Sequence, residues 1–273
     1  MNATPNVELS GVPETMLWTL HDRASEARRP NGILKDPDAV RICDALSIDL
    51  EKRFGPATGM IARRAQIFDA KIRAWMHAHP HGTVVELACG LETQFLRCDN
   101  GSVTWLCVDL PESIEVRERF LPPSVRNPSL RISALDNAWM HAVDKSRPVL
   151  VSIQGLLMYF SPRDVQRLLV DIATSFPGAE LIFDVVPRWL SRLTQQGLQL
   201  SAGYRPPPMP WGINRSEIEQ QLHAWLAGLQ HLSTTPYRAP RGATGLLMLL
   251  GSVTPQIRTR MPCVVSLTLP SKA

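Results

Sequence analysis

The chain has 273 residues, 44% of them hydrophobic, which is enough for one sizeable buried core. Its formal net charge of +4 is dispersed, and no basic run alternates with aromatic residues, so a nucleic-acid partner is not indicated. The apolar runs are shorter than the roughly 20 residues that a membrane helix needs, and the N-terminus has no secretory pattern. Five cysteines without a CxxC pair predict a cytoplasmic protein with reduced thiols and no metal site.

The first part of the chain is predicted to cap a sheet. Residues 1–13 are expected to be a loose arm, and cap helices are expected in the rest of residues 1–57. From residue 58 to residue 79, apolar side chains recur at intervals of three and four positions, which predicts an amphipathic helix. Pro80-His81-Gly82 then ends that helix.

Short apolar runs then alternate with helical stretches over a cofactor-binding core expected in residues 58–200. Pro111 suits the first turn of the helix after the second run, and Ser161 is expected to cap a helix that begins at Pro162. Near-continuous apolar strands separated by helices predict a doubly wound, mostly parallel α/β sheet that is covered on both faces. Strands are expected at residues 83–88, 103–109, 130–135, 148–153 and 179–186.

The last part of the chain is predicted to cover the site. Residues 204–212, YRPPPMPWG, form a proline-rich loop that is too apolar for a free linker and is expected to lie over another part of the chain. A helix is expected at 215–229 and a closing strand at 263–269. We expect a single domain over residues 1–273, in which residues 201–273 supply the substrate lid, the last helices and the closing strand.

Candidate binding residues follow successive strands, at the edge where open α/β sheets bind ligands. Asp109 ends the second strand, nineteen residues after Gly90, and a carboxylate at that spacing can accept two hydrogen bonds from ribose hydroxyls. Each candidate also has a structural alternative, because Gly90 suits an ordinary helix-entry turn, and Asp109 or Asp136 could cap the next helix. The candidates at the strand ends are Glu86, Ala88, Gly90, Asp109, Asp136, Gln154 and Gly155.

The turn after the first strand carries acids where a dinucleotide-binding fold has glycines. It reads E-x-A-x-G-x-E from Glu86 to Glu92, and two carboxylates there would repel a pyrophosphate. They suit a cofactor that carries positive charge and no phosphate. S-adenosylmethionine has a sulfonium, an ammonium and a ribose, so the pattern favours it over a nicotinamide cofactor.

Several segments of the sequence resemble the motifs of the leucine carboxyl methyltransferase family and follow one another in the same order. The likeness covers roughly residues 18–240 and is closest to the bacterial branch that includes the tetracenomycin polyketide-synthesis O-methyltransferase. The DLPE and LMYF segments are specific to the family, whereas the CG turn alone is not. The matching residues are Cys89-Gly90-Leu91-Glu92-Thr93, Arg97, Asp109-Leu110-Pro111-Glu112, Arg117, Ser133, Leu135-Asp136, Trp139, Gly155, Leu157-Met158-Tyr159 and Trp211-Gly212-Ile213.

The resemblance implies a Rossmann-like class I methyltransferase with an N-terminal helical cap and S-adenosylmethionine as cofactor. Arg64, with Arg63 as the alternative, would pair with the cofactor carboxylate, since a planar guanidinium binds a carboxylate in two places. Asp109 would hold the ribose, and Leu110 would pack beside the adenine. The implied cofactor site comprises Arg64, Glu86, Ala88, Gly90, Asp109, Leu110, Leu135, Asp136, Gln154 and Gly155.

The resemblance also implies O-methylation of a small natural-product acceptor by a monomer or homodimer. A carboxylate acceptor is ionised near pH 7 and needs no general base, which slightly favours it over a phenol. A non-catalytic cofactor-binding homologue and an S- or N-methyltransferase of a small metabolite are the alternatives. Candidate catalytic residues are Tyr159, His21 and His141, and the acceptor is expected to contact Tyr159, Trp211, Trp18 and Arg23.

Three positions depart from the family pattern. Ala88 replaces a glycine, Gln94 an arginine and Gln154 a glutamate. The loss of an arginine and of a glutamate is expected to be one compensated change, because each loss alone would leave a charge without its partner. Both glutamines bear on how tightly the cofactor is held.

Overall fold

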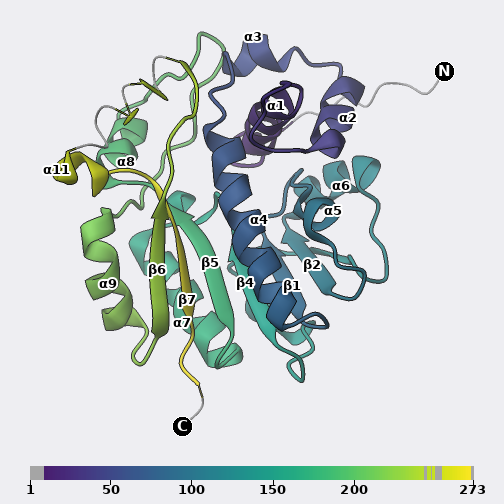
Figure 1. Ribbon diagram of the computed structural model, residues 1–273, viewed down its shortest axis with the longest axis vertical. Helices are drawn as coiled ribbons and strands as arrows, with labels where there is room; N and C mark the ends of the chain where they lie inside the picture. The colour runs from purple at the N-terminus through teal and green to yellow at the C-terminus, as the bar shows by residue number, and fades with distance from the viewer. Residues whose placement is uncertain (1–8, 243–244, 247, 250–253, 272–273) are drawn as a thin grey trace.

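The computed structural model describes residues 9–242, 245–246, 248–249 and 254–271, so residues 1–8 of the expected arm lie outside the described residues. A seven-stranded sheet in the order β3-β2-β1-β4-β5-β7-β6 organises the described part (Figure 1). The first five strands are parallel, and β7 is antiparallel to both β5 and β6. The strands are β1 Thr83–Leu87, β2 Thr104–Asp109, β3 Ser129–Arg131, β4 Val149–Ile153, β5 Glu180–Val185, β6 Gln230–Pro236 and β7 Cys263–Thr268.

The reversal of strand order at β1 confirms the predicted doubly wound α/β sheet. β1 pairs with β2 on one side and with β4 on the other, so the chain builds outward in both directions from this point. Ligands of such sheets bind at the carboxyl ends of the strands around the switch point. No helix in the described part of the chain is long and apolar enough to cross a membrane.

β1 and β4 are buried along their whole length, because helices cover both faces of the sheet. Side chains alternate between the faces, so that Val85 and Leu87 join the core under α7 while Val84 joins the core under α4. The helices around the sheet are α4 Met60–Ala78, α5 Gln94–Cys98, α6 Pro111–Phe120, α7 Pro162–Ser175, α8 Arg188–Gln195, α9 Ile218–Trp225 and α11 Pro255–Arg258, with 3-10 turns η1 Asn137–His141, η2 Leu157–Tyr159 and η3 Arg215–Glu217.

Three N-terminal helices, α1 Thr15–Ala27, α2 Pro37–Ala45 and α3 Leu50–Phe54, cap the sheet at the upper end in Figure 1. They pack around the fully buried Leu20, and Leu91 from the turn after β1 joins the same core. Asp22 ties α1 to the start of α4, since its carboxylate accepts hydrogen bonds from Gly59 N at 2.9 Å and Ala62 N at 3.0 Å. The cap therefore meets both the β1 turn and the first turn of α4.

Two predicted elements are shorter than expected, and one strand escapes prediction. β3 ends at Arg131, because its partner β2 ends opposite it at Asp109 and the chain then enters α6. The helix expected at 215–229 is a 3-10 turn followed by α9, which ends before Gly228 with its φ of 81°. The strand that was not predicted is β6, which lies at the edge of the sheet, where a polar sequence such as QHLSTTP can face solvent. The predicted closing strand, β7, lies between β5 and β6.

Candidate functional site

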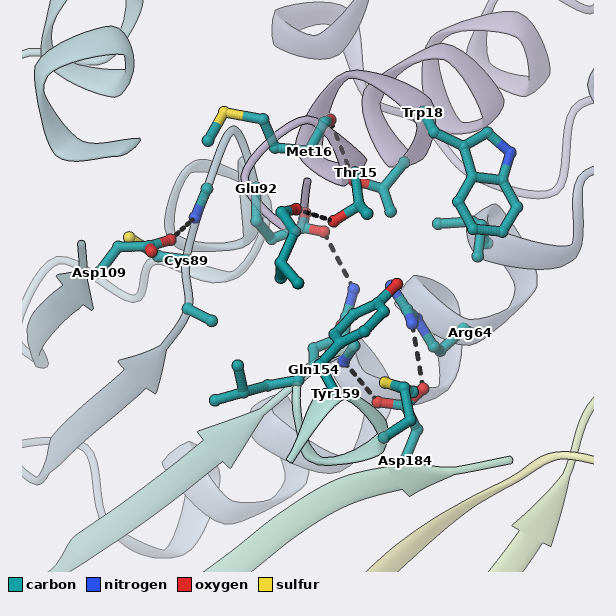
Figure 2. A pocket seen from close by; sticks show the side chains of 18 of the residues that line it. Thr15, Met16, Trp18, Arg64, Cys89, Glu92, Asp109, Gln154, Tyr159 and Asp184 are labelled. Atoms are coloured by element: carbon teal, nitrogen blue, oxygen red, sulfur yellow. Dashed lines mark hydrogen bonds and ion pairs between the residues drawn. The ribbon is translucent and has the colours of Figure 1, made fainter. Parts of the chain in front are cut away.

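A cavity of about 320 Å³ lies at the carboxyl ends of β1, β2, β4 and β5. α1 covers it with Thr15, Met16 and Trp18, and the first turn of α4 contributes Arg64 (Figure 2). The loops after the strands supply the other walls. The predicted cofactor residues that line the cavity are Arg64, Glu86, Ala88, Gly90, Asp109, Leu110, Gln154 and Gly155.

The turn after β1 forms one wall of the cavity with a left-handed backbone. Ala88 has a φ of 56° and Gly90 a φ of 42°. A Cβ on Gly90 would lie 3.0 Å from the Cβ of Met16, so glycine lets α1 pack directly on the turn. Ala88 keeps its Cβ in this conformation, which costs about 1–2 kcal/mol. The turn is therefore strained at Ala88.

Asp109 closes the turn from the side of β2. Its Oδ2 accepts a hydrogen bond from Gly90 N at 2.7 Å, and its Oδ1 accepts one from Leu110 N at 2.7 Å. Burial raises the pKa of Asp109, and the two backbone donors oppose that shift. Ser113 also donates to this carboxylate, and because a carboxylate has about four acceptor sites, Asp109 can still accept a hydrogen bond from a ligand hydroxyl.

Arg117 of α6 holds the turn from below, although the sequence assigns it no role beyond a motif match. Its buried Nη1 donates to the carbonyl oxygens of Gly90 at 2.9 Å and Glu92 at 2.6 Å. Its Nη2 lies 3.4 Å from Cys107 Sγ. The nearby Glu86 carboxylate accepts a hydrogen bond from Trp105, and burial raises its pKa well above the usual value. Glu86 therefore lies against the cavity as a buried acid whose carboxylate already has a partner.

Glu92 is the centre of a buried charge network between the cap and the sheet. Its carboxylate lies 3.0 Å from Arg23 Nη1 and 2.8 Å from Arg97 Nη1. It also accepts a hydrogen bond from Gln154 Nε2 at 3.1 Å (Figure 2). Burial alone would raise the pKa of Glu92, but the two arginines lower it to about 2. An ionised carboxylate therefore lines the cavity at neutral pH.

The two unusual glutamines belong to this network without touching each other. Gln94 Nε2 donates to Asp69 Oδ1 at 2.8 Å, and Arg97 links Asp69 to Glu92. Oε1 of each glutamine is buried with no hydrogen-bond partner among the described residues. Of the two glutamines, only Gln154 lines the cavity. The two glutamines therefore make no direct contact that would support the expected compensation.

Arg64, and not the alternative Arg63, lies at the cavity. Arg64 Nη1 donates to Asp184 Oδ2 at 3.0 Å, while Nε is buried with no partner in the described structure. Arg63 donates instead to Gln66 at 2.6 Å. A buried guanidinium with a free donor is suited to binding a ligand carboxylate.

The other end of the cavity is apolar. It is lined by Trp18, Leu190 and three methionines, which adapt to irregular ligand shapes: Met60, Met158 and Met209, whereas Met16 lies against the turn after β1. Met209 comes from the proline-rich loop, which therefore contributes to the wall of the cavity. Tyr159 projects into the cavity beside Arg64 (Figure 2). Burial raises the pKa of the Tyr159 hydroxyl to about 12.

The family model for leucine carboxyl methyltransferases matches residues 16–173, which contain α1, the β1 turn and the strands through β4. The chain belongs to the leucine carboxyl methyltransferase family. The match confirms the predicted family, and it includes both the cap and the polar wall of the cavity. It ends within α7, so the apolar contributions of α8 and the proline-rich loop lie beyond it.

Relatives of this family member are themselves methyltransferases. The tetracenomycin polyketide synthesis O-methyltransferase TcmP of Streptomyces glaucescens is 31% identical over 221 residues, covering 79% of this chain and 81% of the relative. The S-adenosyl-L-methionine-dependent methyltransferase dpfgK of Gibberella zeae is 28% identical over 189 residues, covering 62% and 63% respectively. The chain is therefore an S-adenosylmethionine-dependent methyltransferase, as the sequence predicts.

Solved structures share the fold at low sequence identity. The plantazolicin methyltransferase BamL, determined with SAH, has a TM-score of 0.52 at 9% identity and covers 96% of this chain and 98% of its own. A SAM-dependent methyltransferase from Anabaena variabilis has a TM-score of 0.51 at 10% identity and covers 79% and 86%. These likenesses confirm the predicted Rossmann-like class I methyltransferase fold.

Both histidines predicted as catalytic candidates lie away from the cavity of this methyltransferase. His21 is buried in α1, where its Nε2 bonds to Gly55 O at 3.0 Å, and His141 is exposed at the end of η1. All seven histidines lie in the described ranges, and none of them lines the cavity. Within the described residues, no cluster of histidine, cysteine or acidic side chains could hold a metal ion.

Two predicted acceptor contacts are also placed elsewhere. Arg23 is 1% exposed and pairs with Glu92 and Asp36, so its charge is used inside the protein. Trp211 packs in the sheet core beside Trp225. The sequence places both residues near family motifs, but their side-chain directions depend on tertiary packing.

Leu135 and Asp136 do not line the cavity. Asp136 caps η1, where its Oδ1 accepts a hydrogen bond from Ala138 N at 2.9 Å, and the wall at this point is formed by Ser133 and Ala134. The adenine contacts of Leu135 and Asp136 stay a prediction.

Replacing Ala88 by glycine is expected to stabilise the protein. Relief of the left-handed strain should stabilise the folded protein by about 1–2 kcal/mol. The greater flexibility of glycine should stabilise the unfolded chain by about 0.5–1 kcal/mol, which offsets part of that effect. The free energy of unfolding in urea should therefore rise by about 0.5–1 kcal/mol. Ala70→Gly, at an exposed position in the right-handed helix α4, is the matched control and should lower it by about 1 kcal/mol. A lower unfolding free energy for Ala88→Gly would contradict the strain.

Asp109→Ala is expected to weaken S-adenosylmethionine binding at least tenfold, or about 1.4 kcal/mol, because both a ligand acceptor and the anchor of Gly90 N are lost. Isothermal titration calorimetry measures this change. Asp144→Ala, which removes an exposed carboxylate that does not line the cavity, is the control and should leave the affinity unchanged. Unchanged affinity in Asp109→Ala would remove Asp109 from the cofactor site.

Proposed function

We propose that the protein transfers the methyl group of S-adenosylmethionine to the carboxylate of a small, largely apolar natural-product acid. The supporting observation is the division of a single cavity. Its polar end carries free hydrogen-bonding groups that match the cofactor, and its apolar end has, among the described lining residues, no group suited to act as a general base.

The polar end fits the chemical groups of S-adenosylmethionine. Gln154 Oε1 is a free acceptor for the ammonium, and Arg64 Nε is a free donor for the carboxylate. Asp109 can accept hydrogen bonds from the ribose hydroxyls. The ionised Glu92 beside Gln154 adds negative charge that favours a cationic ligand over one with a pyrophosphate.

When bound, S-adenosylmethionine supplies a methyl group on a positively charged sulfur. The residues of this chain bring the acceptor into line with that methyl group and keep water away. Met16 and Trp18 of α1 both line the cavity, Met16 against the turn after β1 and Trp18 on the side of Arg64 (Figure 2). Such alignment at near-attack distance is worth up to about 7–11 kcal/mol of the barrier.

A carboxylate acceptor suits Tyr159 and Asp184, which lie beside Arg64 (Figure 2). The hydroxyl of Tyr159 stays protonated at neutral pH because its pKa is about 12, so it can donate a hydrogen bond but does not act as a base. The Asp184 carboxylate is bonded to Arg64 and to Gly155 N. A carboxylate nucleophile is ionised at neutral pH and needs no proton acceptor, whereas a phenol does. The likeness to TcmP, named for polyketide synthesis, supports a polyketide-like acid.

The dependence of the rate on pH distinguishes the two acceptor types. With an aromatic acid, kcat/KM should change little between about pH 6 and pH 9, because the acceptor is ionised throughout and Tyr159 does not titrate. With a phenol of pKa near 10, kcat/KM should rise about tenfold per pH unit over that range. A methyl-transfer assay with radiolabelled donor on matched acids and phenols measures both profiles.

The product identifies the acceptor atom independently. A methyl ester releases methanol when it is treated with base, whereas a methyl ether or a methylated amine does not. Base-labile label in the product supports the proposal. Base-stable label would contradict it in favour of a phenol, thiol or amine acceptor, and binding of S-adenosylmethionine without turnover on any acceptor would favour the non-catalytic alternative.

Met209→Ala is expected to impair acceptor binding alone. Loss of a buried methionine side chain from the apolar end should raise the KM of an apolar acid about tenfold and leave the Kd of S-adenosylmethionine within about twofold. Met140→Ala, a buried methionine that does not line the cavity, is the matched control and should lower stability without changing KM. An equal change in both variants would separate Met209 from the acceptor site.

A further inference from the structure

Asp184 at the carboxyl end of β5 joins three segments that are far apart in the sequence. Its Oδ1 accepts a hydrogen bond from Gly155 N at 2.6 Å, and its Oδ2 accepts one from Arg64 Nη1 at 3.0 Å and one from Tyr237 Oη at 3.3 Å. The side chain of Asp184 is completely buried, and that of Arg64 is 6% exposed. One carboxylate therefore fixes both the loop after β4 and the first turn of α4 (Figure 2).

Gly155 brings the two bonded groups into contact. It has a φ of 73°, and a Cβ at this position would lie 2.9 Å from Arg64 Nη1 and 3.1 Å from Nη2. The guanidinium therefore packs against the backbone of the loop that also carries Gln154. Because the loop and the guanidinium share Asp184, neither can move without changing the position of the other.

This arrangement uses one nitrogen of Arg64 and leaves the rest of the guanidinium available. Nη1 is held by Asp184, whereas Nε is buried and has no partner in the described part of the chain. Nε and Nη2 form one edge of the planar group, and such an edge can bind a carboxylate with two parallel hydrogen bonds. Its direction is set by the contact at Nη1.

We propose that Asp184 is a positioning residue for the methyl donor. It orients Arg64 so that the Nε–Nη2 edge meets the carboxylate of S-adenosylmethionine, and it holds Gly155 so that Gln154 Oε1 faces the ammonium of the same ligand. This inference rests on the proposed function, which assigns Arg64 and Gln154 to the amino-acid end of the cofactor. The sequence does not single out Asp184, which ends an ordinary apolar strand.

Asp184→Glu tests position separately from charge. The variant keeps the ion pair but moves the carboxylate by one methylene, so the edge of Arg64 is turned away. The Kd of S-adenosylmethionine should rise at least tenfold. The Kd of 5′-methylthioadenosine, which keeps the adenosine and the sulfur but lacks the amino-acid end, should stay within about twofold. Both affinities are measured by isothermal titration calorimetry on the full chain.

The controls separate this inference from the function on which it rests. Val185→Ile adds a methylene at the next residue of β5, on the opposite face, and should change neither affinity. Arg64→Lys keeps the charge but loses the two-point edge, and should weaken only S-adenosylmethionine. If Arg64→Lys weakens S-adenosylmethionine selectively and Asp184→Glu does not, positioning by Asp184 is overturned and the proposed function stands. If neither variant is selective, the assignment of Arg64 fails as well.

Gly155→Ala supplies a second test should Asp184→Glu not fold. Its Cβ would push against Arg64 without altering Asp184, so the same selective loss of S-adenosylmethionine affinity is expected. An equal loss for both ligands, in either variant, would mean general distortion of the cavity and would overturn the positioning role.

Discussion

Glu92 lies buried between Arg23 of α1 and Arg97 of α5, and its ion pair with Arg23 fixes the helical cap to the turn that ends β1. Arg23 also pairs with Asp36, at the start of α2. Removing one member of such a network leaves a buried charge uncompensated, at a cost of about 3–5 kcal/mol. The cap can therefore leave the cavity only at the expense of these pairs. The placement of Met16 and Trp18 over the site depends on this constraint.

The same carboxylate determines how the chain can use glutamine at position 154. Because Nε2 of Gln154 donates to Glu92, its Oε1 points away from that carboxylate and is buried with no partner in the described structure. A glutamate here would set a second carboxylate beside Glu92 and would be repelled by it. The amide therefore pairs with Glu92 without adding charge. Gln94 plays the corresponding part against Asp69, outside the cavity.

Close backbone packing is the second constraint on the site. Gly90 admits Met16 from the cap, and Gly155 admits Arg64 from α4, in each case where a Cβ would collide. Both glycines also have positive φ, so a larger residue would be strained as well as crowded. Ala88, with a φ of 56°, shows that the turn tolerates one such strain. The cavity is therefore shaped by backbone contacts as much as by side chains.

Local pattern was enough to predict the sheet and the strand ends. Apolar runs flanked by helices predicted the doubly wound fold, and the acids after β1 and β2 marked residues that line the cavity, because buried parallel strands and their polar ends leave a one-dimensional signal. The same pattern could not predict β6, which has a polar sequence because it lies at the edge of the sheet. Side-chain direction needed the tertiary structure: Arg23 and His21 turned away from the cavity, while Asp184 and Arg117 proved to support it. The physical reason is that each of these side chains takes at least one partner more than twenty residues away along the chain, and only the folded packing decides which partner each one meets.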